Sequence, residues 1–251
     1  MIKKTSVEAF SRVRKNGINA ITIREGDTLL EARLTNGQNE ILMGVKSGRA
    51  IRFPEAKVRP MGRSAAGVRG ITLDGPDDAV VGMISVDPND KSKTVLVVSE
   101  KGYGKRSDLD EYRMTNRGGK GVKTLQVTPK TGYLATIKSV GEENDLMITN
   151  KSGITIRISV TDMRVMGRAT QGVKVIRIDD GDAIADIAVM AKAEEEIEEA
   201  IVLDENGNPI ENPETPAGSE TSAETPTAEN ETNTEGEEGD TTDEADSEEK
   251  E

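Results

Sequence analysis

Two cations stand among three glycines in the segment Arg117-Gly-Gly-Lys-Gly121, directly before an apolar run that is typical of a strand. Glycine lets the backbone approach a ligand closely, and arginine and lysine carry positive charge, so this segment is suited to contact an anion. The wider stretch recurs along the chain. We number the copies in chain order: box 1 is residues 11–21, box 2 is 60–71, box 3 is 114–125 and box 4 is 165–176.

The boxes carry cations at matching distances from one glycine, which we call the box glycine: Gly17, Gly67, Gly121 and Gly172. Cations lie eight residues before it (Arg59, Arg113, Arg164), four before it (Arg63, Arg117, Arg168) and two after it (Arg69, Lys123, Lys174). Box 3 adds Lys120, and box 1 contributes Arg12, Arg14 and Lys15. These thirteen side chains are the predicted binding residues.

The boxes are open to a purely structural interpretation and to one as nucleotide-binding loops. In the structural interpretation the glycines form tight turns and the cations are solvated charges on strand edges. In the second, Gly62–Gly67 and Gly167–Gly172 have the glycine spacing of a phosphate-binding loop, which requires Lys-Ser or Lys-Thr next. Val68 and Val173 stand there instead, which argues against a nucleotide site.

A third interpretation is contact with the DNA backbone. Repetition of the same cations along an array predicts a belt of positive charge, which suits phosphates spaced along a duplex better than a compact ligand. Aromatic residues are only 2% of the chain, so stacking platforms for single strands are not expected. The sequence also shows no recognition helix, so sequence-specific readout is not expected either.

The composition divides the chain into a basic body and an acidic end. Residues 194–251 hold 23 of the 46 acidic residues and one of the 33 basic residues, Lys250. Residues 1–193 thus carry a formal net charge of +9 although the whole chain carries −13. The chain has no cysteine or histidine, and we find no paired nucleophile and base, so no catalytic site is predicted. No run suits a membrane span or signal peptide, and a cytoplasmic protein is expected.

A repeat of about fifty residues underlies the boxes. The box glycines are spaced by 50, 54 and 51 residues, and a second series, Gly48, Gly102 and Gly153, keeps the same step. A cation follows each glycine of this second series by four residues: Arg52, Arg106 and Arg157. Lys4 stands at the corresponding place in the first repeat. The predicted repeats are about 1–35, 36–88, 89–141 and 142–193.

The strand signals within a repeat predict an all-β fold. A buried-type run at 41–45, a turn at 46–49 and a returning run at 50–53 form a hairpin pattern. Alternating runs follow the box glycines, at 18–23 and 173–178, and acidic turns come next at 25–27, 74–78 and 179–182. Four short strands per repeat predict an all-β, propeller-like array, with about three and a half such four-stranded blades in residues 1–193.

The acidic end reads differently. Residues 190–202 are a possible helix, and the low apolar content from Asp204 onward predicts a disordered tail. This tail has two interpretations: a solubilising end, or a mimic of DNA whose carboxylates compete for the basic belt in a salt-dependent way.

Several motifs in order resemble one known family: Gly102-Tyr-Gly-Lys-Arg106, Glu111-Tyr-Arg113, Arg117-Gly-Gly-Lys-Gly121 and Met166–Val173. They are similar to the C-terminal DNA-wrapping domain of bacterial DNA gyrase A, with the related domain of topoisomerase IV as an alternative. The hallmark box of that family reads Gln-Arg-Arg-Gly-Gly-Lys-Gly. Thr115 and Asn116 stand where its first two residues would be, in a late blade rather than the first.

The resemblance implies a fragment of a six-bladed pinwheel that wraps double-stranded DNA and supports negative supercoiling by an ATP-hydrolysing type IIA topoisomerase. Its implied partners are DNA, the remainder of DNA gyrase A and the ATP-binding B subunit, with no membrane. It implies no cofactor in this fragment, with ATP and Mg²⁺ serving the whole enzyme. The alternative from another class is a protein-interaction scaffold whose basic edge meets an acidic partner.

Overall fold

The computed structural model describes residues 1–192. The predicted acidic tail, residues 194–251, lies outside the described residues. The helix predicted for residues 190–202 is wrong at its start, because Met190 and Ala191 are the end of a strand; its remainder from residue 193 also lies outside the described part.

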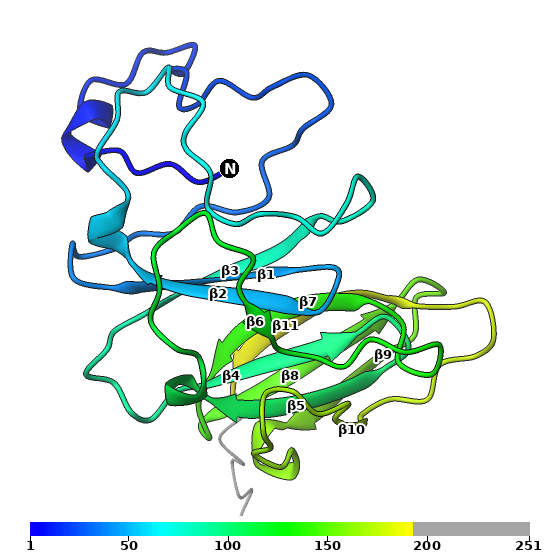
Figure 1. Ribbon diagram of the computed structural model, residues 1–251. Helices are drawn as coiled ribbons and strands as arrows, with labels where there is room; N and C mark the ends of the chain where they lie inside the picture. Colours follow the sequence, from blue (N-terminus) through cyan, green and yellow to red (C-terminus); the bar gives the residue numbers. More distant parts are fainter. Residues whose placement is uncertain (193–251) are drawn as a thin grey trace, which may run out of the picture. The chain divides into compact units, whose positions relative to one another are not determined.

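Strands make up the regular structure of residues 1–192, and the helical elements there are four short 3-10 turns (Figure 1). None of these helical elements is long and apolar enough to cross a membrane. The strands are β1 (Glu40–Val45), β2 (Arg49–Pro54), β3 (Val80–Val86), β4 (Thr94–Ser99), β5 (Tyr103–Asp108), β6 (Val122–Lys123), β7 (Leu134–Val140), β8 (Asn144–Asn150), β9 (Thr155–Ser159), β10 (Val173–Lys174) and β11 (Ile184–Ala191). The 3-10 turns are η1 (Val7–Phe10), η2 (Glu55–Lys57), η3 (Leu109–Glu111) and η4 (Val160–Asp162).

The strands form three antiparallel sheets, in the orders β3-β1-β2-β6, β10-β5-β4-β7 and β11-β8-β9. In each sheet the central hairpin and one flanking strand come from a single repeat. The other flanking strand of the first two sheets comes from the following repeat: β6 pairs with β2, and β10 pairs with β5. Consecutive blades therefore exchange a strand, which is the feature that separates a pinwheel from an ordinary propeller.

The hairpin predicted at 41–53 is confirmed as β1 and β2, joined by a turn in which Gly48 has a φ of +79°. Its sister hairpin, β4 and β5, turns at Gly102 in the same way, with a φ of +78°. The 3-10 turns η2, η3 and η4 follow the second strand of each hairpin and were not anticipated from the sequence.

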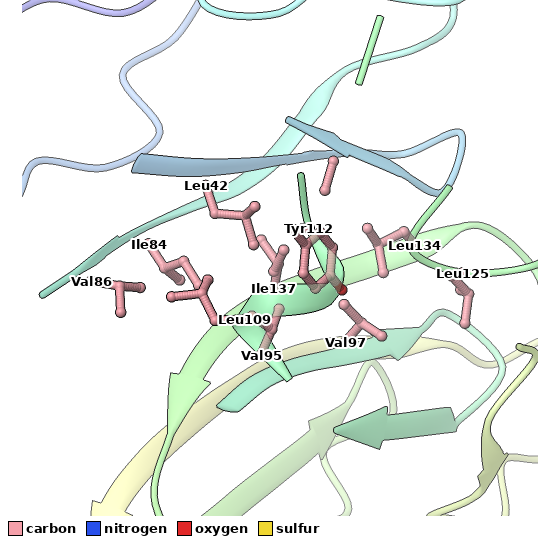
Figure 2. Packing of buried hydrophobic residues seen from close by; sticks show 11 residues of the cluster. Leu42, Ile84, Val86, Val95, Val97, Leu109, Tyr112, Leu125, Leu134 and Ile137 are labelled. Carbon is pink, nitrogen blue, oxygen red and sulfur yellow. The ribbon is translucent and has the colours of Figure 1, made fainter. Parts of the chain in front are cut away.

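Apolar side chains of neighbouring sheets pack against each other and hold the blades together. Leu42 and Ile84 of the first sheet face Val95 and Val97 of the second, with Ile137 between them (Figure 2). The next cluster joins the second and third sheets through Leu96, Val98, Leu146, Ile148 and Ile187. Sheets of alternating apolar side chains bury one another, so the core consists mainly of aliphatic residues, joined by the fully buried Phe53 and Tyr112.

The two ends of the array differ from the predicted four-stranded blades. The third sheet has three strands, and β9 has no partner on its outer edge among residues 1–192. In repeat 1 the segment 18–23, expected to be a strand, is irregular. Its sister segments, β6 and β10, gain their hydrogen bonds from the second hairpin strand of the preceding repeat. In residues 18–23 the carbonyl oxygens of Asn19 and Ala20 instead accept hydrogen bonds from the side chains of Arg63 and Lys3.

Candidate nucleic-acid interface

Boxes 2, 3 and 4 each cross the edge of the preceding repeat at the box glycine. Gly67, Gly121 and Gly172 have φ values of +91°, +71° and +78°. A Cβ on Gly67 would lie 2.6 Å from the carbonyl oxygen of Ile2, and one on Gly172 would lie 2.6 Å from that of Gly104. Any other residue would be strained in this backbone conformation and would collide with the neighbouring strand. The structural interpretation is therefore correct for these three glycines.

The arginine four residues before each box glycine connects that box to the preceding one. Nη1 of Arg117 donates to the carbonyl oxygen of Arg69 at 3.0 Å, and Nη1 of Arg168 donates to that of Lys123 at 2.7 Å. In box 2, Nη1 of Arg63 reaches the carbonyl oxygen of Asn19 at 3.4 Å. All three acceptors lie two residues after the preceding box glycine. We call these three side chains the box arginines.

A second hydrogen bond fixes two of the box arginines. Nε of Arg117 donates to the carbonyl oxygen of Lys57 at 3.0 Å, and Nε of Arg168 donates to that of Glu111 at 3.0 Å. Lys57 and Glu111 are equivalent residues, each at the end of a 3-10 turn. A guanidinium carries five N–H donors, so further donors remain for another acceptor. The box arginines connect consecutive boxes by hydrogen bonds and remain partly exposed, so their charge reaches the surface.

The cations that follow the hairpin glycines are structural. Nη1 of Arg52 donates to the carbonyl oxygens of Leu109 and Tyr112, at 2.7 and 3.0 Å, and Nε of Arg106 donates to that of Met163 at 2.9 Å. Arg52 is 8% exposed and Arg106 is 5% exposed. Each side chain thus holds the 3-10 turn of the next repeat by hydrogen bonds to carbonyl oxygens at that turn.

Lys4 holds the corresponding turn at the start of the array, as its sequence position predicted. Its Nζ donates to the carbonyl oxygen of Glu55 at 3.2 Å, and its backbone bridges to Pro60, as Arg52 does to Met114 and Arg106 to Val165. Arg52 also pairs with Glu40 of its own hairpin, with Nε 2.7 Å from Oε2. The last member of the series, Arg157, makes the equivalent pair with Asp145, with Nε 2.8 Å from Oδ2.

A buried lysine of β5 donates hydrogen bonds to box 4. Lys105 is 0% exposed, and its Nζ donates to the carbonyl oxygen of Gly167 at 2.6 Å and to Oγ1 of Thr170 at 3.2 Å. Burial disfavours the ammonium form and lowers the pKa of Lys105 to about 8; the nearby Glu111 opposes this shift and Arg168 adds to it. Lys3 plays a similar part in box 2 by donating to the carbonyl oxygen of Arg63.

The geometry of the boxes argues against a nucleotide-binding loop. In box 4 the backbone amide of Arg168 donates to the Glu111 carboxylate at 2.5 Å, so the turn already holds an anion of the protein itself. In box 3 the amide of Gly118 donates to the carbonyl oxygen of Gly70 at 2.6 Å. Amides engaged in this way are not directed toward a phosphate. The described residues also contain no cluster of acidic side chains suited to hold a metal ion.

Ten of the thirteen predicted binding residues are exposed, and the box arginines are half-buried. The box arginine bonds bring box 3 close to Arg69 and box 4 close to Lys123, which places cations of consecutive boxes together. The exposed residues are Arg12, Arg14, Lys15, Arg59, Arg69, Arg113, Lys120, Lys123, Arg164 and Lys174. Arg12, Arg14 and Lys15 lie on the irregular segment of repeat 1, apart from the strand-bound boxes.

A family model described as DNA gyrase C-terminal domain, beta-propeller, matches residues 1–36, 39–87, 93–140 and 144–189. The chain belongs to this family. DNA gyrase A of Staphylococcus aureus strain MRSA252 is 45% identical over 200 residues, which cover 79% of this chain and 22% of that protein. The same values hold for DNA gyrase A of strain NCTC 8325. The chain thus spans about a fifth of the length of these relatives.

Solved structures of this gyrase family and its relatives share the fold. The C-terminal domain of DNA topoisomerase IV superposes with a TM-score of 0.71 at 22% identity, covering 76% of this chain and 59% of that one. The DNA gyrase A C-terminal domain gives a TM-score of 0.62 at 24% identity, covering 70% and 58%. The predicted all-β, propeller-like fold and the predicted family are confirmed.

Sequence reasoning missed the supporting residues of this gyrase-type domain. It assigned no role to Lys105 or Glu111, although both contact box 4. A lysine in the middle of an otherwise buried strand was the available signal, since Lys105 stands where the sister strand β2 has Ile51. It also treated the box arginines as binding residues alone, whereas each bridges two boxes.

Proposed function

We propose that this domain binds double-stranded DNA through phosphate contacts along its boxes and wraps it, as a non-catalytic module of a DNA gyrase A protein. The observation that carries the proposal is the hydrogen-bonded connection from each box to the preceding one, repeated three times. These bonds join the cations of consecutive boxes into a series that repeats about every fifty residues. A polymer of phosphates is the ligand whose charge recurs in the same manner.

Backbone contact, rather than base readout, fits the side chains available. The exposed cations of boxes 2 to 4 stand on short strands and turns, and residues 1–192 contain no α-helix to enter a major groove. Bending the duplex would bring more of its phosphates within reach of the cations of successive boxes. Wrapping therefore follows from the proposed mode of binding.

The proposal extends to the whole enzyme by family membership. There the domain would act with the remainder of DNA gyrase A and with the ATP-binding B subunit in the cytoplasm, and ATP and Mg²⁺ would serve those parts. The domain itself would supply DNA binding and the path of the duplex to ATP-dependent negative supercoiling.

Salt dependence and DNA length test the proposal together. We expect the logarithm of the association constant for a long linear duplex to fall linearly with the logarithm of salt concentration, by about 0.9 for each phosphate contacted. A duplex too short to bend around the array should bind more weakly per site. Equal affinity for short and long duplexes with a flat salt dependence would favour the protein-interaction scaffold instead.

Wrapping has its own readout. Closing a nicked plasmid with ligase while the chain is bound should shift the linking number of the product, since a wrapped path traps a writhe of one sign. A short duplex added in excess should abolish the shift, because it occupies the cations without providing a closed path. Unchanged linking number alongside salt-dependent binding would mean binding without wrapping.

A further inference from the structure

An apolar side chain lies seven residues before the box glycine in boxes 2, 3 and 4. These residues are Pro60, Met114 and Val165, and all three are exposed. Met114 is 44% exposed and Val165 is 47% exposed. An arginine directly precedes each of them, and the box arginine follows three residues later. The order arginine, apolar residue, box arginine is thus kept three times.

The backbone around these apolar residues is fixed. The amide of Thr115, next to Met114, donates to the carbonyl oxygen of Arg52 at 2.9 Å. In box 4 the amide of Met166 donates to the carbonyl oxygen of Arg106 at 2.8 Å. The side chain of the residue that provides each acceptor is itself bonded to the next 3-10 turn. Exposure of Met114 and Val165 is therefore a property of an ordered edge and not of a loose loop.

Box 1 departs from this order. Ala9 stands in place of the arginine, and Phe10 is half-buried at the end of η1. Exposed apolar residues at the matching position are thus confined to the boxes that are bound to a preceding strand. In boxes 2 to 4 these residues keep apolar surface that the folded domain leaves exposed.

The chemistry of a nucleic-acid strand matches this order. A strand alternates phosphates with sugars, and a deoxyribose presents an apolar C2′ methylene where ribose carries a hydroxyl that both donates and accepts hydrogen bonds. An apolar side chain placed between two phosphate-binding arginines covers that position. Covering a methylene is favourable, while covering a hydroxyl without a partner is costly.

We propose that Pro60, Met114 and Val165 pack against deoxyribose and make the domain select DNA over RNA. This inference rests on the proposed binding of duplex DNA by the boxes. It assigns the three residues to sugar recognition and leaves affinity for phosphate to the cations. Serine in place of these residues would offer the ribose hydroxyl a hydrogen-bond partner and remove the apolar contact.

The test compares one duplex sequence made as DNA and as RNA, bound by the wild type and by the double variant Met114→Ser, Val165→Ser. A-form geometry disfavours RNA in both proteins, so the informative quantity is the change in the DNA-to-RNA affinity ratio. We expect this ratio to fall about tenfold in the double variant. The salt slope on DNA should stay the same, because no charge is removed.

A matched control carries the same kinds of change elsewhere. Met190 on β11 is 39% exposed and Ile154 in the β8–β9 turn is 54% exposed, so Ile154→Ser, Met190→Ser should keep the wild-type ratio. An unchanged ratio in the box variant overturns the inference and leaves DNA binding standing. A wild type that binds neither duplex overturns the proposed function itself, and the inference with it.

Discussion

Arg106 and Lys123 belong to two series of cations that recur with the same period, yet their surroundings are opposite. Arg106 is 5% exposed and donates to the carbonyl oxygen of Met163, so its charge is used inside the protein. Lys123 is exposed on the outer strand β6, and its contribution to the array is its backbone. A periodic cation therefore lies either at the joint between two blades or on an exposed edge, and its burial distinguishes the two cases.

Arg157 shows what the buried series does, because it is the member with no following turn to hold in residues 1–192. Its side chain is 40% exposed and pairs with Asp145 within the same hairpin. Arg106 and Arg157 thus occupy the same place in the repeat, but only Arg106 holds a following 3-10 turn within residues 1–192. The box arginines lie between the two classes, since they bridge boxes and remain half-buried.

The largest effect should come from breaking a joint between blades. Replacing Arg106 by Met removes the donor to Met163 and leaves that carbonyl group buried without a partner. We expect the free energy of unfolding to fall by about 3 kcal/mol. Urea unfolding of the variant measures the loss. A matched control is Lys151→Met, whose exposed side chain lies outside the joints and which should cost under about 1 kcal/mol. Equal losses in both variants would contradict the assignment of Arg106 as a joint.

A pH effect should distinguish the buried lysine beneath box 4 from the exposed lysines. The pKa of Lys105 is about 8 in the folded protein, below its ordinary value of 10.5. Between these pH values the unfolded chain binds a proton that the folded chain has lost, so stability rises with pH across this window. We expect a rise of roughly 1–3 kcal/mol, seen as an increasing urea midpoint.

The variant Lys105→Met is the control for this rise. Its sister residue in β2 is Ile51, so an apolar side chain is tolerated at the equivalent place. The free energy of unfolding of the wild type minus that of the variant should rise as the pH increases from 8 to 10.5, because the variant lacks the titrating group. A difference that is constant with pH would show that the Lys105 ammonium is not disfavoured by burial.

A smaller effect is expected from the hydroxyl of Tyr112, which lies between the first two sheets. Figure 2 shows the Tyr112 side chain within the apolar cluster between these sheets. Oη of Tyr112 and Oγ1 of Thr124 are 2.5 Å apart, and both residues are 0% exposed. Burial raises the pKa of Tyr112 to about 12, so the hydroxyl keeps its proton at neutral pH. Tyr112→Phe should cost about 1 kcal/mol of stability, because one buried hydrogen bond is lost while packing is kept. Thermal unfolding checks this, and an unchanged midpoint would exclude a structural role for the bond.

The repeat, the hairpins and the all-β fold could be predicted from the sequence because glycines and aliphatic runs mark them locally. Gly48 and Gly102 adopt the turn conformation that their neighbours suggested. The exchange of β6 and β10 between repeats could not be predicted, since pairing partners depend on contacts between distant residues. The third sheet has three strands within residues 1–192 because, in the first two sheets, the fourth strand comes from the following repeat.

The candidate site was predicted in its residue types and only partly in their roles. The cations around the box glycines were found from their spacing, and ten of the thirteen are exposed. Arg117 and Arg168 each donate hydrogen bonds to two backbone carbonyl groups. These bonds depend on the approach of neighbouring repeats, which the spacing in the sequence does not predict. Their DNA contacts stay a prediction.

In the proposed mode of binding, the location of the exposed box cations, and not the total charge, determines affinity for DNA. The decisive comparison is the salt slope of duplex binding for two triple variants with the same charge change. One replaces Arg69, Lys123 and Lys174 of the boxes by Gln, and the other replaces Lys101, Lys130 and Lys151 by Gln, which are exposed outside the boxes. We predict that the slope of the box variant falls by about 2.7 and that of the other variant stays near the wild-type value. Equal slopes for the two variants would contradict binding through the boxes.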